Sequence, residues 1–293
     1  MSAVTSVEYA TQGCALFSGR RRQRQHLVGA VPPRHHDRVQ RVELDGVRVE
    51  YELTGQGEPV VLLHARPFVM WYLPLVAELQ HVSVLRYRRE APVGWRIEDD
   101  ARLCTRLLGV LGIRRAHVIG HSYGGIVALE LARQGGAELR SIALIEPATI
   151  GLLPPDDAAA RTAPLVEMAR VEGAGTAMDR FLRAVTGAEG PEALDELIPG
   201  ALTDALSHAA GFFAVELPAA ARWTFAAEDA TVIGMPVLHL RGATSAPRFA
   251  EGAALVESWF PAAEHRMLDG VNHLMMASAP EPAAALLTRF WAS

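Results

Sequence analysis

Residues 116–125 have the sequence Ala-His-Val-Ile-Gly-His-Ser-Tyr-Gly-Gly, and residues 120–124 match the pattern G-x-S-x-G with Ser122 at its centre. The apolar residues 116–119 predict a short buried strand, and residues 124–133 predict a helix. A sharp strand-to-helix turn requires small residues two positions before and after the serine. Such a turn places the hydroxyl group at a helix N-terminus, which stabilises developing negative charge. Ser122 is therefore a candidate nucleophile, and the alternative is a glycine-rich turn with a helix-capping serine.

Strands and helices alternate on both sides of this turn. Short continuous apolar runs predict buried strands, and apolar residues spaced three and four apart predict helices. The pair Asp45-Gly46 predicts a two-residue hairpin. This alternation is typical of a parallel sheet with helices on both faces. The predicted strands are 42–53 (as a hairpin), 59–64, 82–87, 116–120, 141–146, 236–241 and 265–268, and the predicted helices are 71–79, 99–111, 124–133, 247–259 and 280–291.

The alternation is interrupted between residues 148 and 232. This segment is rich in Ala, Pro, Gly and Glu, and its apolar residues recur at helical spacing, which predicts several short helices and no strand. Residues 1–40 carry more arginines than acidic residues and show no sustained hydrophobic period, which predicts a disordered or loosely packed extension rather than a targeting or nucleic-acid-binding arm. The predicted organisation is an extension (1–40), a first core part (41–147), a helical insert (148–232) and a second core part (233–293).

The composition excludes several function classes. None of the 293 residues is lysine, so all 28 basic residues are arginines, which excludes Schiff-base chemistry and a P-loop lysine. A net charge of −5 gives no indication of nucleic-acid or membrane binding. We expect a cytoplasmic protein, because no apolar run approaches the roughly 18 residues of a spanning helix and the N-terminus lacks a signal-peptide pattern. Cys14 and Cys104 provide neither a disulfide framework nor metal-ligand spacing.

Taken together, these features resemble the α/β-hydrolase superfamily. The resemblance rests on residues 120–125, on the helix that follows them and on residues 141–147 (Ser-Ile-Ala-Leu-Ile-Glu-Pro), and it covers residues 41–293 in element order. It implies an α/β fold with a mostly parallel eight-stranded sheet flanked by helices. It also implies that a helical cap, inserted after the sixth strand, covers the site. Most members hydrolyse esters, lactones, amides or carbon–carbon bonds, and some are lyases, peroxidases or non-catalytic receptors.

The resemblance implies a base and an acid for Ser122. His273 follows a predicted strand end and matches the late histidine of the family, which accepts the serine proton and later returns it. The usual acid position, the loop 242–247, contains no carboxylate. A second position used in the family, the end of the strand after the nucleophile helix, holds Glu146. We therefore expect Glu146 to orient His273, with a backbone or arginine partner for Glu146, or Asp269 or Glu251 as the acid, as the alternatives.

The oxyanion-hole donors are predicted in the same way. One is the backbone N–H of Tyr123, the residue after the nucleophile. The other is the backbone N–H of Arg66, because residues 64–67 (His-Ala-Arg-Pro) resemble the family's His-Gly-x-Pro. The Arg66 guanidinium is expected to bind a substrate carboxylate, pair with Glu146 or point to solvent. The candidate substrate-binding residues are aromatic, with cap packing as the alternative, and they are Trp71, Phe212, Phe213 and Trp223.

The sequence therefore predicts a hydrolase that cleaves an ester or lactone of a small to medium, largely apolar molecule through an acyl-enzyme. We expect no cofactor and no metal site. In particular, His117 and His121 are four residues apart, but they lie on a predicted strand and turn rather than on a helix. Two alternatives remain open: carbon–carbon cleavage or a lyase reaction at the same site, and a ligand-binding protein without catalytic turnover. The partner expected in each case is a small molecule, while the oligomeric state is not predicted.

Overall fold

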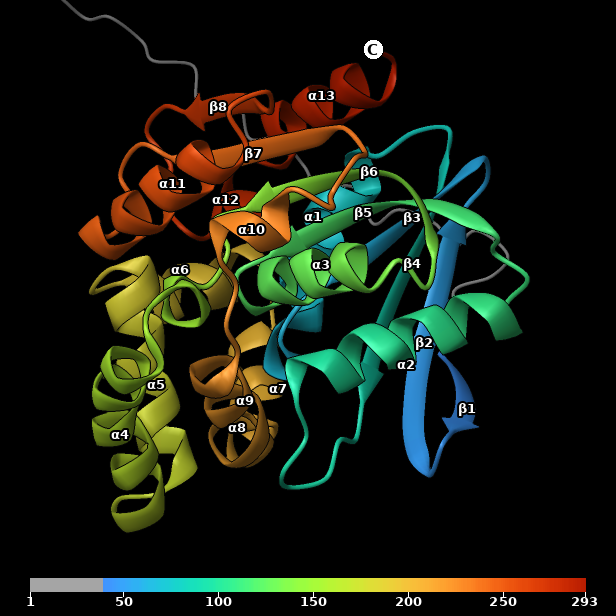
Figure 1. Cartoon of the computed structure of the whole chain (residues 1–293). Helices are drawn as coiled ribbons and strands as arrows, with labels where there is room; N and C mark the ends of the chain where they lie inside the picture. Colours follow the sequence, from blue (N-terminus) through green and yellow to red (C-terminus); the bar gives the residue numbers. More distant parts are fainter. Residues whose placement is uncertain (1–38) are drawn as a thin grey trace, which may run out of the picture. The chain divides into compact units, whose positions relative to one another are not determined.

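A computed structural model describes residues 39–293 (Figure 1). The predicted extension therefore lies outside the described residues, except for its last two positions. Within the described part, no helix combines the length and the apolar content needed to cross a membrane.

The described residues contain an eight-stranded sheet with the strand order β1-β2-β4-β3-β5-β6-β7-β8. The first two strands form an antiparallel hairpin, β2 pairs antiparallel with β4, and all further pairs are parallel. This arrangement confirms the predicted mostly parallel α/β sheet. The strands are β1 (Gln40–Leu44), β2 (Val47–Gly55), β3 (Glu58–Leu63), β4 (Val82–Arg89), β5 (Arg115–His121), β6 (Glu138–Ile145), β7 (Val237–Gly242) and β8 (Glu264–Leu268).

Local residue chemistry accounts for the edge and the centre of the sheet. The turn between β1 and β2 places Asp45 at φ 52° and Gly46 at φ 79°, the left-handed conformations that a two-residue hairpin requires. In the centre, residues 60–63 of β3 and 116–121 of β5 are buried and mostly apolar, as expected for parallel strands with helices on both faces.

The helices of the core flank this sheet. Helices α2 (Ile97–Val110) and α3 (Tyr123–Gln134) pack against each other, and α1 (Leu73–Glu78) packs against α12 (Met275–Ser278) and α13 (Pro280–Trp291). In Figure 1, α3 lies in front of the central strands and α1 behind them. Helix α11 (Pro247–Trp259) contacts β7. The helix expected over residues 71–79 begins earlier, as the 3-10 turn η1 (Arg66–Tyr72), because Pro67 suits the first turn of a helix.

Helices occupy the stretch between β6 and β7, and the described residues 146–236 contain no strand. Figure 1 shows these helices grouped on one side of the sheet, beside the carboxyl end of β6. Polar and apolar residues alternate at helical spacing here, and the buried positions contact the core. The elements are η2 (Thr149–Leu152), α4 (Pro155–Val171), α5 (Ala174–Thr186), α6 (Gly190–Leu197), α7 (Ala201–Ser207), α8 (Ala209–Gly211), η3 (Phe212–Glu216), α9 (Leu217–Arg222) and α10 (Ala227–Ala230).

The first turn of α3 lies in direct contact with the end of β3. A side chain at Gly124 would overlap the backbone carbonyl of Leu63, and one at Gly120 would meet the backbone of Gly124. Both glycines are therefore needed for the close approach of two backbones rather than for an unusual φ. The turn can place Ser122 at the sheet edge only while these two positions lack a Cβ atom.

We predict that Gly124→Ala lowers the free energy of unfolding by roughly 3 kcal/mol or more, because neither backbone segment can yield without moving a buried strand. Gly109→Ala is the matched control. Gly109 also lies in a helix, but a Cβ atom there meets nothing within 4 Å, so this change should stabilise the protein by about 0.5–1 kcal/mol. Urea denaturation of both variants measures the difference. Similar stabilities for the two variants would contradict the proposed close contact.

Candidate active site

Ser122 occupies a strained turn between β5 and α3. Its backbone has φ 55° and ψ −119°, a conformation that side-chain-bearing residues rarely adopt. Three backbone hydrogen bonds hold it: the Ser122 N–H donates to the Ile145 carbonyl at 3.0 Å, and the Ser122 carbonyl accepts from the N–H groups of Gly125 and Ala148 at 2.9 Å each. Strain of this kind persists where surrounding bonds over-determine it, and it is concentrated at functional sites.

Glu146 and His273 form a buried hydrogen-bonded pair. His273 Nδ1 lies 2.7 Å from Glu146 Oε2, and the Gly242 N–H donates to Glu146 Oε1 at 2.8 Å. Both side chains are at most 3% exposed. Burial raises the pKa of Glu146, but the hydrogen bond and the charge interaction with His273 outweigh it, so the pKa lies below its usual value. An ionised Glu146 holds the proton of His273 on Nδ1, which leaves Nε2 available to accept a proton.

Two of the alternatives considered for Glu146 and His273 can be compared with the structure. Within the described part of the chain, no ion pair joins Glu146 to Arg66. Glu251 pairs with Arg161 at 3.3 Å. Glu146 directly follows β6 and has φ 40°, which makes it a second strained residue at the same edge of the sheet as Ser122. This backbone conformation turns its side chain toward the loop that carries His273.

His273 lies between two rings. Its centroid is 4.2 Å from that of Phe249, which stacks on it, and 4.4 Å from that of His121. His121 Nδ1 is hydrogen-bonded to the Tyr72 hydroxyl group at 2.7 Å. Burial lowers the pKa of His121 well below its usual value and that of neighbouring His64 to about 3. Both imidazoles are therefore neutral at neutral pH and add no charge next to His273.

A cavity of about 580 Å³ is open to Ser122 and Tyr123, a size typical of small-molecule sites. A small recess beside it is lined by Ser122, His121 and His273, so the nucleophile and the base share one wall. Most other lining side chains are apolar, and many come from the helical insert. They include Phe68, Ile150, Leu165, Phe181, Val185, Phe212, Leu217 and Phe249.

The structure divides the four aromatic candidates into two groups. Phe212 lines the cavity, and Trp71 lines the recess beside Ser122. Phe213 and Trp223 are absent from the described cavity lining and are buried elsewhere. The Trp223 Nε1–H donates to the Glu130 carboxylate at 2.9 Å. Helical spacing marks a buried side chain but does not distinguish the cavity wall from the packed interior.

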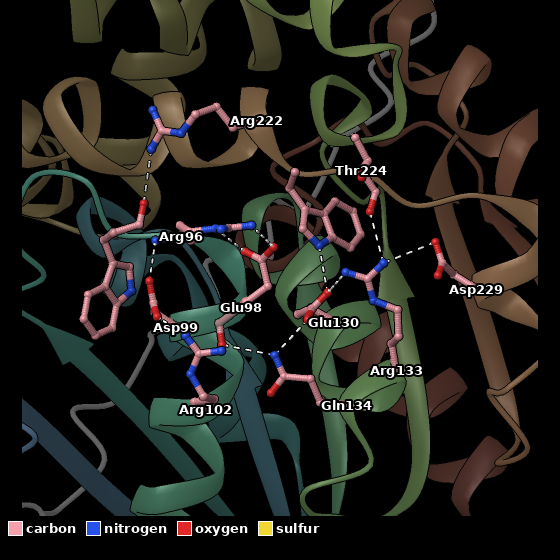
Figure 2. Close-up of polar contacts among 12 residues, drawn as sticks. Arg96, Glu98, Asp99, Arg102, Glu130, Arg133, Gln134, Arg222, Thr224 and Asp229 are labelled. Atoms are coloured by element: carbon pink, nitrogen blue, oxygen red, sulfur yellow. Dashed lines mark hydrogen bonds and ion pairs between the residues drawn. The ribbon is translucent and has the colours of Figure 1, made fainter.

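Figure 2 shows the polar contacts around Glu130, the residue that accepts the Trp223 Nε1–H bond. Arg133 extends from α3 toward Glu130, the Thr224 carbonyl and Asp229. Its guanidinium also lies 5.8 Å from the Trp223 ring centroid. These contacts attach the end of the helical insert to α3. In this structure Trp223 therefore packs between the helical insert and α3, which is the alternative given above for this residue.

The two predicted oxyanion donors differ in their environment. Tyr123 is the first residue of α3, where a backbone N–H has no acceptor within the helix. The Arg66 N–H donates to both carboxylate oxygens of Glu216, at 2.9 and 3.0 Å. Glu216 belongs to η3 of the helical insert and is buried. In this conformation the second predicted donor is therefore engaged by a carboxylate.

Glu216 is part of a buried charged network. Arg89 Nη1 lies 2.7 Å from Glu216, and Arg89 Nη2 donates to Asp100 at 2.7 Å. Asp100 accepts a further bond of 2.5 Å from the Tyr123 hydroxyl group. Burial raises the pKa of Glu216, although the Arg89 charge opposes this shift. The network, which we call the Arg89 network (Arg89, Asp100, Glu216), thus contacts both residues predicted to supply the oxyanion hole. The sequence contains no local pattern that identifies it.

Comparison with known proteins identifies the family. A model of the alpha/beta hydrolase family matches residues 36–286. A putative carbamate hydrolase, RutD, of Pantoea ananatis is 42% identical over 59 residues, which are 20% of this chain and 22% of the relative. The acetyltransferase component of the acetoin cleaving system of Cupriavidus necator is 32% identical over 119 residues, which are 37% of this chain and 32% of the relative. The matched segments thus span well under half of these relatives.

Solved structures resemble this fold over most of its length. The enol-lactonase of Burkholderia xenovorans gives a TM-score of 0.74 at 20% identity, covering 87% of this chain and 100% of that chain. A thermophilic esterase of Thermogutta terrifontis gives 0.73 at 21% identity, covering 86% and 97%. Identities this low establish the fold alone. With the match over residues 36–286 and the geometry at Ser122, they lead to one conclusion: the chain belongs to the alpha/beta hydrolase family of enzymes.

Proposed function

We propose that this protein hydrolyses a carboxylic ester or lactone through an acyl-enzyme formed on Ser122. The observation that carries the proposal is the buried 2.7 Å bond between Glu146 and His273, beside a strained serine at a helix N-terminus. A carboxylate buried at the edge of the sheet is costly unless it is fully hydrogen-bonded. Its position next to the nucleophile gives it a chemical role, since it fixes the imidazole tautomer that accepts a proton from serine.

The proposed reaction has two steps. Ser122 Oγ attacks the carbonyl carbon while His273 Nε2 takes its proton, and the resulting imidazolium is stabilised by Glu146. His273 then returns the proton to the departing alkoxide oxygen as the ester C–O bond breaks, which leaves an acyl-serine. Water, activated by His273, hydrolyses this intermediate and restores Ser122. In a lactone, the departing alcohol remains attached to the acyl group.

The cavity supports a largely apolar substrate of small to medium size. Its lining of Phe68, Phe181, Phe212 and Leu165 offers apolar contact beside the reacting carbonyl. The helical insert supplies much of this lining, and we propose that it acts as a cap over Ser122. The names of similar proteins, an enol-lactonase and esterases, agree with a substrate of this class. Carbamates belong in the substrate panel because of the RutD relatives.

Ser122→Ala should lower kcat by about ten-thousand-fold or more while the protein remains folded, because no other group supplies the attacking oxygen. Hydrolysis of a chromogenic ester series and labelling with a fluorophosphonate probe measure the loss. The wild-type chain should react with the probe and the variant should not. An unlabelled wild type would support the non-catalytic binder, and near-normal activity in the variant would exclude the serine mechanism.

Glu146→Gln should lower kcat by about a thousand- to ten-thousand-fold, since a carboxamide neither fixes the tautomer nor stabilises the imidazolium. Asp269→Asn is the matched control, because Asp269 is an exposed carboxylate in the same loop region as His273. The control should retain kcat within about twofold of the wild type. If Asp269→Asn is the impaired variant, Glu146 is not the acid.

Glu216→Gln tests whether the Arg66 N–H is an oxyanion donor. A neutral amide accepts a weaker hydrogen bond than a carboxylate, by about 1 kcal/mol, so a substrate oxyanion competes more easily for that N–H. We therefore expect kcat on small activated esters to rise, by about fivefold or less. Steady-state kinetics of the folded fraction measure this change. A fall in kcat with an unchanged KM would instead make Glu216 a support for the loop and remove Arg66 from the proposed hole.

A further inference from the structure

Two histidines and a glutamate converge on a part of the sheet that the proposed reaction does not use. His239 lies in β7, His265 lies at the paired position in β8, and Glu257 lies near the end of α11. The nitrogen or oxygen atoms that these three side chains can offer all lie within 4.8 Å of one another. Among the described residues, this is the one group of three His, Cys, Asp or Glu side chains arranged in this way.

The orientation of His265 leaves a lone pair directed at this cluster. Its Nε2 lies 3.0 Å from the Phe260 carbonyl oxygen, which can only accept a hydrogen bond. The ring proton therefore lies on Nε2, and in a neutral imidazole Nδ1 carries the lone pair. A metal-ligating histidine typically donates its other N–H to a backbone carbonyl in this way, which fixes the ring orientation.

The spacing of the two imidazoles fits a metal better than a direct bond. His239 Nδ1 and His265 Nδ1 are 3.4 Å apart, whereas N–H donors usually lie about 2.9–3.0 Å from their acceptors. Two nitrogen ligands bound at about 2.0–2.1 Å in a tetrahedral site lie about 3.3–3.4 Å apart. The observed separation therefore matches that of two ligands of one tetrahedral ion.

Glu257 adds a negatively charged carboxylate to the two imidazoles as a third candidate metal ligand. Its side chain is exposed, and within the described part of the chain its carboxylate takes part in no hydrogen bond or ion pair. Two imidazoles and one carboxylate form the donor set of known zinc sites, in which solvent takes the fourth position.

We propose that His239, His265 and Glu257 form a site for a divalent transition-metal ion, with Zn²⁺ as the best match. The ion would join the end of α11 to β7 and β8. Phe249, near the other end of α11, stacks on His273, so the site would anchor the helix that covers the base. This inference does not rest on the proposed ester hydrolysis, because the metal contacts none of Ser122, His273 or Glu146.

The test uses the full chain, purified without a polyhistidine tag and stripped with a chelator. Calorimetric titration with Zn²⁺ should give one site per chain with a dissociation constant of about 1 µM or below, and Zn²⁺ should raise the thermal midpoint. Co²⁺ should give the visible absorption of a tetrahedral complex.

Glu257→Gln and His265→Gln should each weaken Zn²⁺ binding by about tenfold or more, and the Zn²⁺-dependent rise in thermal midpoint should shrink accordingly. Both replaced side chains lie at least partly at the surface, so folded variants are expected.

Matched controls separate this site from adventitious binding. Glu196→Gln and His208→Gln change a glutamate and a histidine outside the cluster, and the double change His35→Gln with His36→Gln removes the adjacent pair near the N-terminus. All three should bind Zn²⁺ as the wild type does. Ser122→Ala should bind it too, so a failure of the proposed hydrolase function leaves this result unaffected. Zn²⁺ affinity that persists in both cluster variants, or that disappears in the His35/His36 variant, would overturn the proposal.

Discussion

The packing of one backbone on another at the start of α3 is the constraint on which the site depends. Gly124 lies against the Leu63 carbonyl group, so the first turn of α3 packs directly on the end of β3. Ser122, the residue directly before the helix, takes φ 55°. Bonds to Ile145 and Ala148 retain this conformation from the neighbouring strand and loop. A strained residue at this position is stable because packing and hydrogen bonds in three elements agree on it.

The same logic explains how an acid can come from β6 when the loop after β7 contains none. Glu146 leaves its strand at φ 40°, which directs the side chain across the end of β7. The Gly242 N–H there donates to one carboxylate oxygen, and the other oxygen is hydrogen-bonded to His273 Nδ1. The last residue of β7 thus contributes a backbone donor to Glu146, while the loop that follows contributes no carboxylate. Because both oxygens are bonded, the buried charge is compensated and the imidazole is held in one orientation.

Features encoded in short stretches were predictable from the sequence, and features formed between distant stretches were not. The hairpin at Asp45, the turn at Ser122 and each strand or helix of the alternating pattern follow from neighbouring residues, and the structure confirms the predicted sheet. Glu146 could be predicted as the acid because the family resemblance points to the end of the strand after the nucleophile helix, and the sequence has a carboxylate there. Glu216 lies 150 residues from Arg66 and inside a helical pattern, so its contact with the predicted donor depends on how the helical insert folds back. The same limit applies to Trp223, whose burial was predictable but whose neighbours were not.

The Arg89 network fixes the relative geometry of the elements that it joins, whether or not it stabilises the fold. Replacing such a network by apolar side chains is often neutral or stabilising, so it is weak evidence for a contribution to folding energy. Its value lies in geometry: the planar guanidinium of Arg89 meets Asp100 in the core and Glu216 in the helical insert at the same time. An apolar contact would tolerate sliding between these elements, whereas directed hydrogen bonds do not. Since Asp100 also contacts the Tyr123 hydroxyl group and Glu216 the Arg66 N–H, the network links the helical insert to both residues predicted to supply the oxyanion hole.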